Sequence, residues 1–292
     1  MKYFDLHCDT LSEIFNKGES LRENTCHVSL NKASVFEKYT QVLAVWSDNS
    51  LSDDENYEKF LKILDHAETQ IRNIDFFIPI LAVEGGKLLN NDISRLDVLK
   101  NRGIRIFTLV WKGNTCMGGA YDNNEGLSSF GKAVTERLLE YSIVPDLSHS
   151  NDIICAQALE MARYYGKPVI ASHSCARSIC SHPRNISDEI ARSVAESGGL
   201  VGVNMVSEHL GGRSTEAVLA HIERLLDKAG KESVCFGCDF DGMSDAYLPE
   251  GIKNVGDMPI LYDKIAKKYH SEALADKIFY SNAQNFANVY LF

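Results

Sequence analysis

The sequence predicts an α/β fold, a (β/α)8 (TIM) barrel, from two patterns. Short apolar runs bounded by turn residues alternate with segments in which apolar residues recur at helical spacing. Five of the apolar runs end on a residue type that binds metal ions. Because the carboxyl ends of parallel strands meet on one face of a barrel, we expect these end residues to lie together.

The expected elements follow one another in a strand–helix alternation. The predicted strands are residues 3–7, 40–46, 77–84, 105–111, 143–149, 168–173, 199–204 and 234–239. The predicted helices are residues 54–73, 95–101, 130–141, 151–165, 188–197 and 215–229, with further helices packed on the barrel in residues 248–292. An open doubly wound sheet is the main alternative, but no Gly-x-Gly-x-x-Gly follows the first strand.

Composition indicates one globular domain that comprises residues 1–292. The chain is 45% hydrophobic and 24% charged, and no linker or repeat divides it. A net charge of −10 disfavours a nucleic-acid partner. We expect no membrane partner and a cytoplasmic location, because no signal peptide or long apolar stretch is visible. The sequence leaves a homodimer open.

The eight cysteines lack the spacing of a disulfide scaffold, and we expect reduced thiols. Cys235 and Cys238 form a Cys-x-x-Cys pair on a predicted strand. Positions i and i+3 of a strand face opposite sides, so these two thiols should not bind one metal ion.

His7 and Asp9 end the first predicted strand with i, i+2 spacing. Their side chains should therefore project to the same side, while Cys8 between them faces the core. A histidine and a carboxylate side by side suit a divalent metal such as zinc. The alternative is an ordinary strand-end turn with a capping aspartate.

Three further predicted strands end on a residue of a type that binds metal ions. Glu84 precedes two glycines, and its two carboxylate oxygens could bridge two cations; alternatively it is an exposed loop residue. His149 and His173 follow their strands in serine-rich contexts and, taken singly, could be structural hydrogen-bonded residues. Their occurrence with His7 and Asp9 on one barrel rim favours a metal site.

Asp239 ends the last predicted strand, which lies beside the first strand in a closed barrel. We therefore predict that Asp239 is the general base that accepts a proton from metal-bound water. Asp241 points the same way two residues later. It could be a ligand, although we favour a role in capping the turn at Gly242.

Together these segments resemble the membrane (renal-type) dipeptidase family, peptidase family M19 of the amidohydrolase superfamily. The matching stretches cover almost the whole chain in the family's order: Asp5-Leu-His7-Cys-Asp9, Val83-Glu84-Gly-Gly, Gly126-Leu-Ser-Ser-Phe-Gly131, Asp146-Leu-Ser-His149, Ser172-His173-Ser174, Arg184-Asn185 and Gly237-Cys-Asp239-Phe-Asp241-Gly242.

The resemblance implies a metal-dependent hydrolase barrel with a binuclear zinc site, that is, two Zn²⁺ per chain. His7 and Asp9 would bind one zinc and His149 and His173 the other, with Glu84 as the bridge. The resemblance also implies that Asp239 is the acid/base residue and that Arg184 holds the substrate's C-terminal carboxylate, for which a guanidinium fork is suited.

One stretch departs from the family pattern. Where well-known members have Thr-Leu-Thr-His, this chain has Thr108-Leu-Val-Trp111. Trp111 can donate through its indole N–H but cannot titrate, which puts the substrate range and the stabilisation of the oxyanion in doubt. We predict that Trp111 and the nearby Asn114 contact the substrate.

The sequence thus predicts a zinc-dependent dipeptidase in which a metal-bridging hydroxide attacks the peptide carbonyl of a dipeptide with a free C-terminal carboxylate. Another amidohydrolase reaction on the same site, by a deacylase, a lactonase or a deaminase, is the first alternative. A non-catalytic metal-binding protein is the second.

Overall fold

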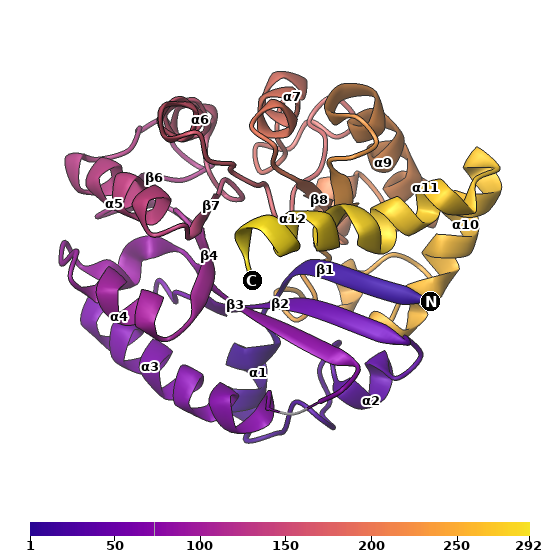
Figure 1. The fold of residues 1–292 in the computed structure, drawn as a ribbon, viewed down its shortest axis with the longest axis horizontal. Helices are drawn as coiled ribbons and strands as arrows, with labels where there is room; N and C mark the ends of the chain where they lie inside the picture. Colours follow the sequence, from indigo (N-terminus) through magenta and orange to yellow (C-terminus); the bar gives the residue numbers. More distant parts are fainter. Residues whose placement is uncertain (73) are drawn as a thin grey trace.

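The computed structural model describes residues 1–72 and 74–292 and shows an α/β fold in which helices surround a curled parallel sheet (Figure 1). The seven strands lie in the order β7-β4-β3-β2-β1-β9-β8. They are β1 (Lys2–Cys8), β2 (Lys38–Trp46), β3 (Phe77–Glu84), β4 (Ile104–Thr108), β7 (Val144–Asp146), β8 (Val201–Val203) and β9 (Val234–Phe236). A separate small hairpin consists of β5 (Asn114–Thr115) and β6 (Gly118–Gly119).

Residues 168–173 lie between the two edge strands but do not form the predicted strand. Single parallel bridges join Ile170 to Asp146 and Ala171 to Val201. The ladder does not extend, because Pro168 has no N–H and the Ser172 N–H donates to the Asp146 side chain at 2.8 Å. The Ser172 carbonyl instead lies close to the backbone just after β9, since a Cβ on Gly237 would lie 1.7 Å from it. The sheet therefore has seven strands, and not the eight of the predicted barrel.

Several strands also end earlier than predicted. β4 ends at Thr108 and not at residue 111, β7 ends at Asp146 and not at residue 149, and β9 ends at Phe236 and not at residue 239. Beyond β7 and β9 the backbone turns through left-handed residues, His149 (φ 66°) and Asp239 (φ 62°), which a strand does not accommodate. His149 and Asp239 thus lie on short turns that follow the strands, whereas His7 and Glu84 lie within β1 and β3.

The helices largely follow the predicted pattern. They are α1 (Thr10–Lys17), α2 (Leu30–Ala33), α3 (Asp53–Gln70), α4 (Arg95–Asn101), α5 (Ser129–Glu140), α6 (Asp152–Tyr165), α7 (Asp188–Glu196), α8 (Ser207–Leu210), α9 (Thr215–Ala229), α10 (Pro259–Tyr269), α11 (Glu272–Asp276) and α12 (Asn282–Tyr290). α3 begins after a capping box between Ser52 and Glu55, and the predicted end of this helix, Asn73, lies outside the described residues. α1, α2 and α8 were not predicted. Among the described helices, none is both long and apolar enough to cross a bilayer.

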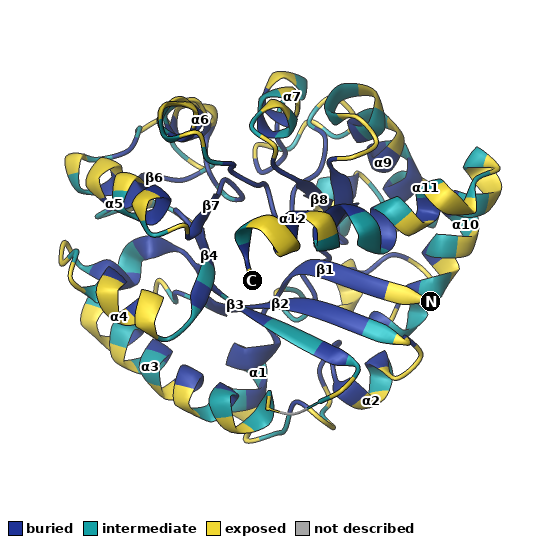
Figure 2. Cartoon of the chain, in the orientation of Figure 1, coloured by how far each residue is buried: buried dark blue, intermediate teal, exposed yellow. Residues whose placement is uncertain are grey.

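The apolar core has two parts. One lies between the strands and the surrounding helices, and the other fills the interior of the curled sheet. Phe286 and Leu291, from α12 and the residue after it, join the inner part together with strand residues such as Phe4, and α12 crosses the opening of the sheet in Figure 1. In Figure 2 most of β1 and β2 is buried, β3 is partly intermediate, and the outward faces of the helices are exposed. Cys235 belongs to the inner part and Cys238 to the outer, which confirms that they face opposite sides.

Candidate active site

The six residues predicted as metal ligands or base come together where the strands end. His7 lies on β1, Asp9 stands directly before α1 without a side-chain capping hydrogen bond, and Glu84 is the last residue of β3. His149, His173 and Asp239 lie on the turns after β7, after residues 170–171 and after β9. The six side chains therefore come from elements far apart in the sequence and form one cluster in the folded chain.

Glu84 lies at the centre of this cluster. Its Oε1 atom is 2.8 Å from His149 Nε2 and 3.3 Å from His173 Nε2. Its Oε2 atom is 3.6 Å from His7 Nε2. The two carboxylate oxygens thus face different histidines, which is the arrangement needed for a carboxylate shared between two cations.

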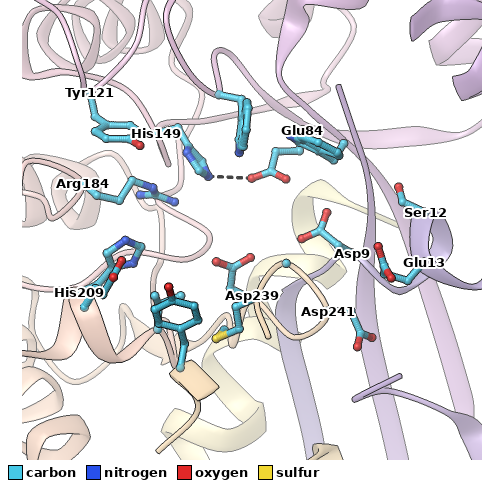
Figure 3. Close-up of a pocket in the computed structure, with 17 residues that line it drawn as sticks. Asp9, Ser12, Glu13, Glu84, Tyr121, His149, Arg184, His209, Asp239 and Asp241 are labelled. Atoms are coloured by element: carbon cyan, nitrogen blue, oxygen red, sulfur yellow. Dashed lines mark ion pairs between the residues drawn. The ribbon is translucent and has the colours of Figure 1, made fainter. Parts of the chain in front are cut away.

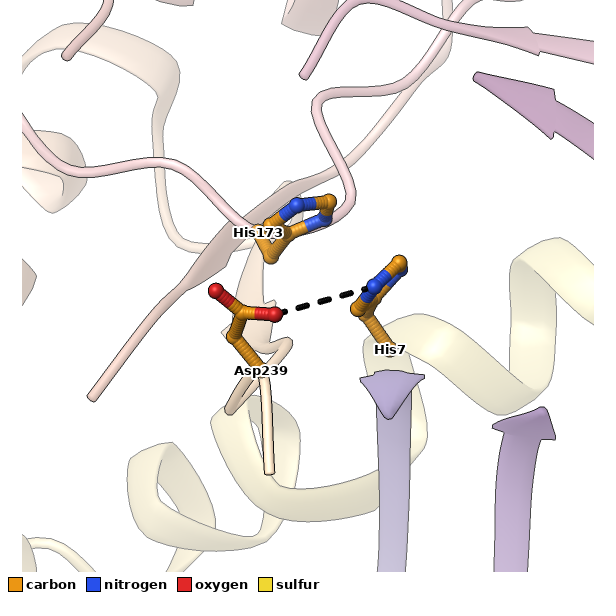
Figure 4. A group of neighbouring side chains, drawn as sticks. All are labelled: His7, His173 and Asp239. Atoms are coloured by element: carbon orange, nitrogen blue, oxygen red, sulfur yellow. Dashed lines mark ion pairs between the residues drawn. The ribbon is translucent and has the colours of Figure 1, made fainter. Parts of the chain in front are cut away.

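His7 connects the cluster to two further carboxylates. Its Nε2 atom is 3.5 Å from Asp9 Oδ2 and 3.7 Å from Asp239 Oδ1. Figure 4 shows Asp239 reaching toward His7 below the His173 ring, and the two imidazole centroids are 3.7 Å apart. The ligand atoms fall into three overlapping sets, each within 4.8 Å: His7, His173 and Asp239; Glu84, His149 and His173; and His7, Asp9 and Glu84.

The donor atoms fit divalent cations such as zinc. Imidazole nitrogens and carboxylate oxygens are the ligands that zinc accepts in catalytic sites. Within the described part of the chain, the buried atoms His7 Nε2 and Asp9 Oδ1 have no hydrogen-bond partner. A buried polar atom without a partner costs free energy unless something else compensates it, and a bound cation would do so.

The protonation of the metal-free cluster follows from burial and mutual charge. Burial, together with the positive charge of Arg184, lowers the pKa of His149 to about 4. Burial and the charge of His7 hold the pKa of His173 well below its usual value. Both rings are therefore neutral near pH 7, the form in which imidazole binds a metal ion.

The pKa values of the acidic residues differ sharply. Burial would raise the pKa of Glu84, but the charge of His7 keeps that pKa well below normal. Burial raises the pKa of Asp239 to about 7, and the charge of His7 opposes this shift. A carboxyl group with a pKa near 7 can exchange a proton at neutral pH, as a general base must.

Two buried aspartates support the ligand turns in the same way. Asp5 Oδ1 accepts hydrogen bonds from His7 N (3.1 Å) and Cys238 N (2.9 Å). Asp146 Oδ1 accepts from Ser148 N (3.0 Å) and Ser172 N (2.8 Å). Asp5 thus links β1 to the segment after β9, next to His7 and Asp239. Asp146 links β7 to residues 170–173, next to His149 and His173.

A cavity of about 490 Å³ opens over the cluster. Figure 3 shows Arg184 and His209 on one side of it and Ser12 and Glu13 on the other, with Glu84 and Asp239 between. Arg184 is 3% exposed and donates to His173 O at 3.1 Å and to Ser174 Oγ at 3.5 Å. Its Nε has no partner among the described residues. A buried guanidinium with so few partners is ready to bind an anion.

The remaining predicted residues are placed differently. Trp111 lines the cavity, 6.3 Å from His149 between ring centroids. Asn114 is exposed on β5 and is not among the residues that line the cavity. The predicted turn-capping role of Asp241 is wrong, because Gly242 N donates to the carbonyl of Asp239. Asp241 instead accepts from Thr10 Oγ1 (2.5 Å) and Val28 N (3.3 Å).

Sequence reasoning missed several residues of the cavity wall. Trp46 ends β2 after an apolar run, the signal that found the ligands, but an indole is not a metal-ligand type. Tyr121 comes from an irregular segment and His209 from the single-turn helix α8. No periodicity marks such residues, and only the folded chain brings them to the site.

A set of histidines and carboxylates at the carboxyl ends of a curled parallel sheet is typical of metal-dependent hydrolases. The profile of the membrane dipeptidase family (peptidase family M19) matches residues 54–288. That match covers well over half of the chain, and the chain belongs to this family.

Individual relatives agree with this assignment. The chain is 30% identical to mouse dipeptidase 3 over 209 residues, which is 68% of this chain but only 41% of that protein. Among solved structures, dipeptidase AC, a metallopeptidase of family M19, superimposes with a TM-score of 0.90 at 23% identity and covers 100% of this chain and 99% of its own. A Rhodobacter sphaeroides metallopeptidase, liganded with a phosphinate mimic of L-Ala-D-Ala, gives a TM-score of 0.88 at 22% identity, with 100% and 99% coverage. At such identities the structures show a shared fold.

Proposed function

We propose that this protein is a metal-dependent dipeptidase that hydrolyses dipeptides with a free C-terminal carboxylate and uses two zinc ions. The observation that carries the proposal is the position of the underpartnered Arg184 at the wall of the cavity over the Glu84 cluster. Membership in the membrane dipeptidase family supports it. The (β/α)8 architecture that we predicted from sequence belongs to the same proposal, with residues 168–173 in the place of the missing strand.

In this proposal His7 and Asp9 hold one cation, His149 and His173 hold the other, and Glu84 binds both. Cations held there would lower the pKa of a bound water molecule and polarise the scissile carbonyl group. Arg184 would pair with the substrate carboxylate and so fix the peptide bond over the cluster. The buried pair would also compensate the guanidinium charge, which few protein groups now neutralise.

Asp239 would move the proton. Its carboxylate lies beside His7 at the floor of the cavity, opposite Glu84 (Figure 3). It would accept the proton of the attacking water and return it to the amine that leaves. A pKa near neutrality in the metal-free site suits both transfers, although bound cations would lower it.

The test compares pairs of dipeptides that differ only in the C-terminal group. The zinc-loaded protein should cleave a dipeptide with a free carboxylate and leave the C-terminally amidated form intact. Elemental analysis should find two metal ions per chain. Equal rates on both substrates would contradict the role of Arg184 and favour another amidohydrolase reaction, whereas metal binding without turnover over a broad panel would favour a non-catalytic protein.

A further inference from the structure

Both tryptophans of the chain line the cavity over the cluster. Trp46 and Trp111 contact each other edge to face, with ring centroids 4.9 Å apart and an interplanar angle of 71°. Each is partly exposed to the cavity. The Glu84 cluster accounts for neither of them, since an indole neither binds zinc nor titrates. The pair is an apolar wall beside a site of charged residues.

Short contacts hold this wall next to Glu84. Trp46 pairs with Glu84 in the register of β2 and β3, and the following Ser47 Oγ donates to the Gly85 carbonyl at 2.6 Å. Trp111 passes over Gly85, where an added Cβ would lie 3.1 Å from Trp111 Cβ and where φ is +86°. A side chain at position 85 would therefore be strained and would push the indole away. The wall is a fixed part of the rim.

Strand order places Trp46 across the cavity from Arg184, whereas Trp111 follows β4, which is two places from residues 170–171. β2, which ends in Trp46, is four places from residues 170–171 in either direction around the curled sheet. Arg184 belongs to the loop after those residues and donates to the His173 carbonyl. A ligand whose carboxylate pairs with Arg184 and whose peptide bond lies over Glu84 therefore extends its other end toward Trp46.

We propose that Trp46 and Trp111 form the binding pocket for the side chain of the substrate's N-terminal residue, and that the enzyme prefers a large apolar or aromatic residue there. The proposal rests on the dipeptidase function proposed above and names its substrate class. An aromatic side chain against this pair would bury apolar surface and could add a further edge-to-face contact. A cavity of about 490 Å³ has room for such a dipeptide.

The kinetic test uses two pairs of dipeptides. Phe-Ala and Gly-Ala differ at the N-terminal residue, and Ala-Phe and Ala-Gly differ at the C-terminal one. We expect kcat/KM for Phe-Ala to exceed that for Gly-Ala by at least about tenfold. Trp46→Ala should lower kcat/KM for Phe-Ala by about 10- to 100-fold and for Gly-Ala by less than about threefold, and Trp46→Phe should restore most of the loss. Tyr164→Ala, which removes an 85% exposed aromatic on α6, is the matched control and should change neither.

A binding test does not depend on turnover. Because the chain has only two tryptophans, its intrinsic fluorescence reports on this wall. Phosphinate analogues of Phe-Ala and Gly-Ala should both bind, and the Phe analogue should bind at least tenfold more tightly and shift the emission more. Trp111→Phe should reduce that shift without abolishing the preference.

Three outcomes would overturn the inference. They are equal rates for Phe-Ala and Gly-Ala, a preference that follows only the C-terminal residue, and a Trp46→Ala variant that loses both substrates equally. In each of these cases dipeptides are still cleaved and the proposed function stands. If no dipeptide is cleaved at all, the proposed function fails and this inference fails with it.

Discussion

The two ends of the curled sheet differ in the side chains that fill them: apolar side chains at the amino ends of the strands and charged or polar ones at the carboxyl ends. At the amino ends of the strands, α12 closes the interior with apolar side chains such as Phe286, which is 5% exposed. At the carboxyl ends, buried polar atoms remain without partners, among them His7 Nε2, Asp9 Oδ1 and Arg184 Nε. The first end is filled by apolar side chains of the chain itself, whereas in the proposed function the buried metal-ligand atoms and the guanidinium at the second end are compensated by cations and an anionic ligand. Substitutions at the two ends should therefore affect different properties, stability at one and activity at the other.

Removal of metal should have the largest effect on turnover. A strong chelator should abolish dipeptide hydrolysis, and added zinc should restore it, because in the proposed mechanism the cations polarise the carbonyl group and activate the water molecule. The melting temperature should also fall on chelation, since a ligand at a hundredfold excess over its Kd stabilises the native state by about 2.7 kcal/mol. If activity survives complete removal of metal, verified by elemental analysis, the carboxyl end of the sheet does not depend on cations and the prediction is wrong.

Asp239→Asn should have the next largest effect. The amide keeps the shape of the side chain but cannot accept a proton, so kcat should fall about 10²- to 10⁴-fold while KM changes little. Both metal ions should stay bound, as measured by elemental analysis. If the variant instead loses a metal ion, Asp239 is a ligand, as its place in a set with His7 and His173 also allows.

Arg184→Ala should act mainly on substrate binding. Loss of a buried partner for the substrate carboxylate typically costs about 2–5 kcal/mol, which should appear as a rise in KM in steady-state kinetics on free dipeptides. Arg163→Ala, at an exposed position on α6, is the control and should leave KM unchanged. An unchanged KM in the Arg184 variant would remove the main support for carboxylate recognition.

Phe286→Ala should have the smallest effect on turnover and a large one on stability. The cavity that it leaves inside the sheet should lower the free energy of unfolding by about 3–5 kcal/mol in urea titrations. At temperatures where the variant stays folded, kcat/KM should match that of the parent protein. Val289→Ala, on the same helix but 69% exposed, should change neither quantity. A specific loss of activity in the folded Phe286 variant would show that the two ends are coupled.

The sequence alone predicted the cluster better than the sheet. His7, Asp9, Glu84, His149 and His173 could be located because each follows an apolar run, and the fold then brings such ends together. The individual roles of these residues remain predictions. The seven-stranded sheet differs from the predicted eight strands because a side-chain acceptor, Asp146, takes a backbone N–H that a regular ladder would use.

Other features could not be predicted because they depend on tertiary contacts. The carboxylate of Asp241 binds the Thr25–Val28 region through Val28 N, more than two hundred residues earlier, and no local pattern indicates such a partner. The position of Trp46 opposite Arg184 follows from the order of the strands in the sheet, and the sequence predicted the strands but did not fix that order. Periodicity describes one element at a time, whereas the cavity wall depends on which elements are neighbours.

The meeting of β1 and β9 has a consequence for how the protein folds. Asp5 pairs with Phe236, and its carboxylate accepts from Cys238 N across a sequence separation of 233 residues. Closing a loop of this length carries a large entropic cost that local contacts cannot repay, so this junction should form late in folding. His7 and Asp239 flank the junction, and partly folded molecules would lack the contact between them even if most helices had formed. Recovery of hydrolysis during refolding should therefore lag behind recovery of helical circular dichroism.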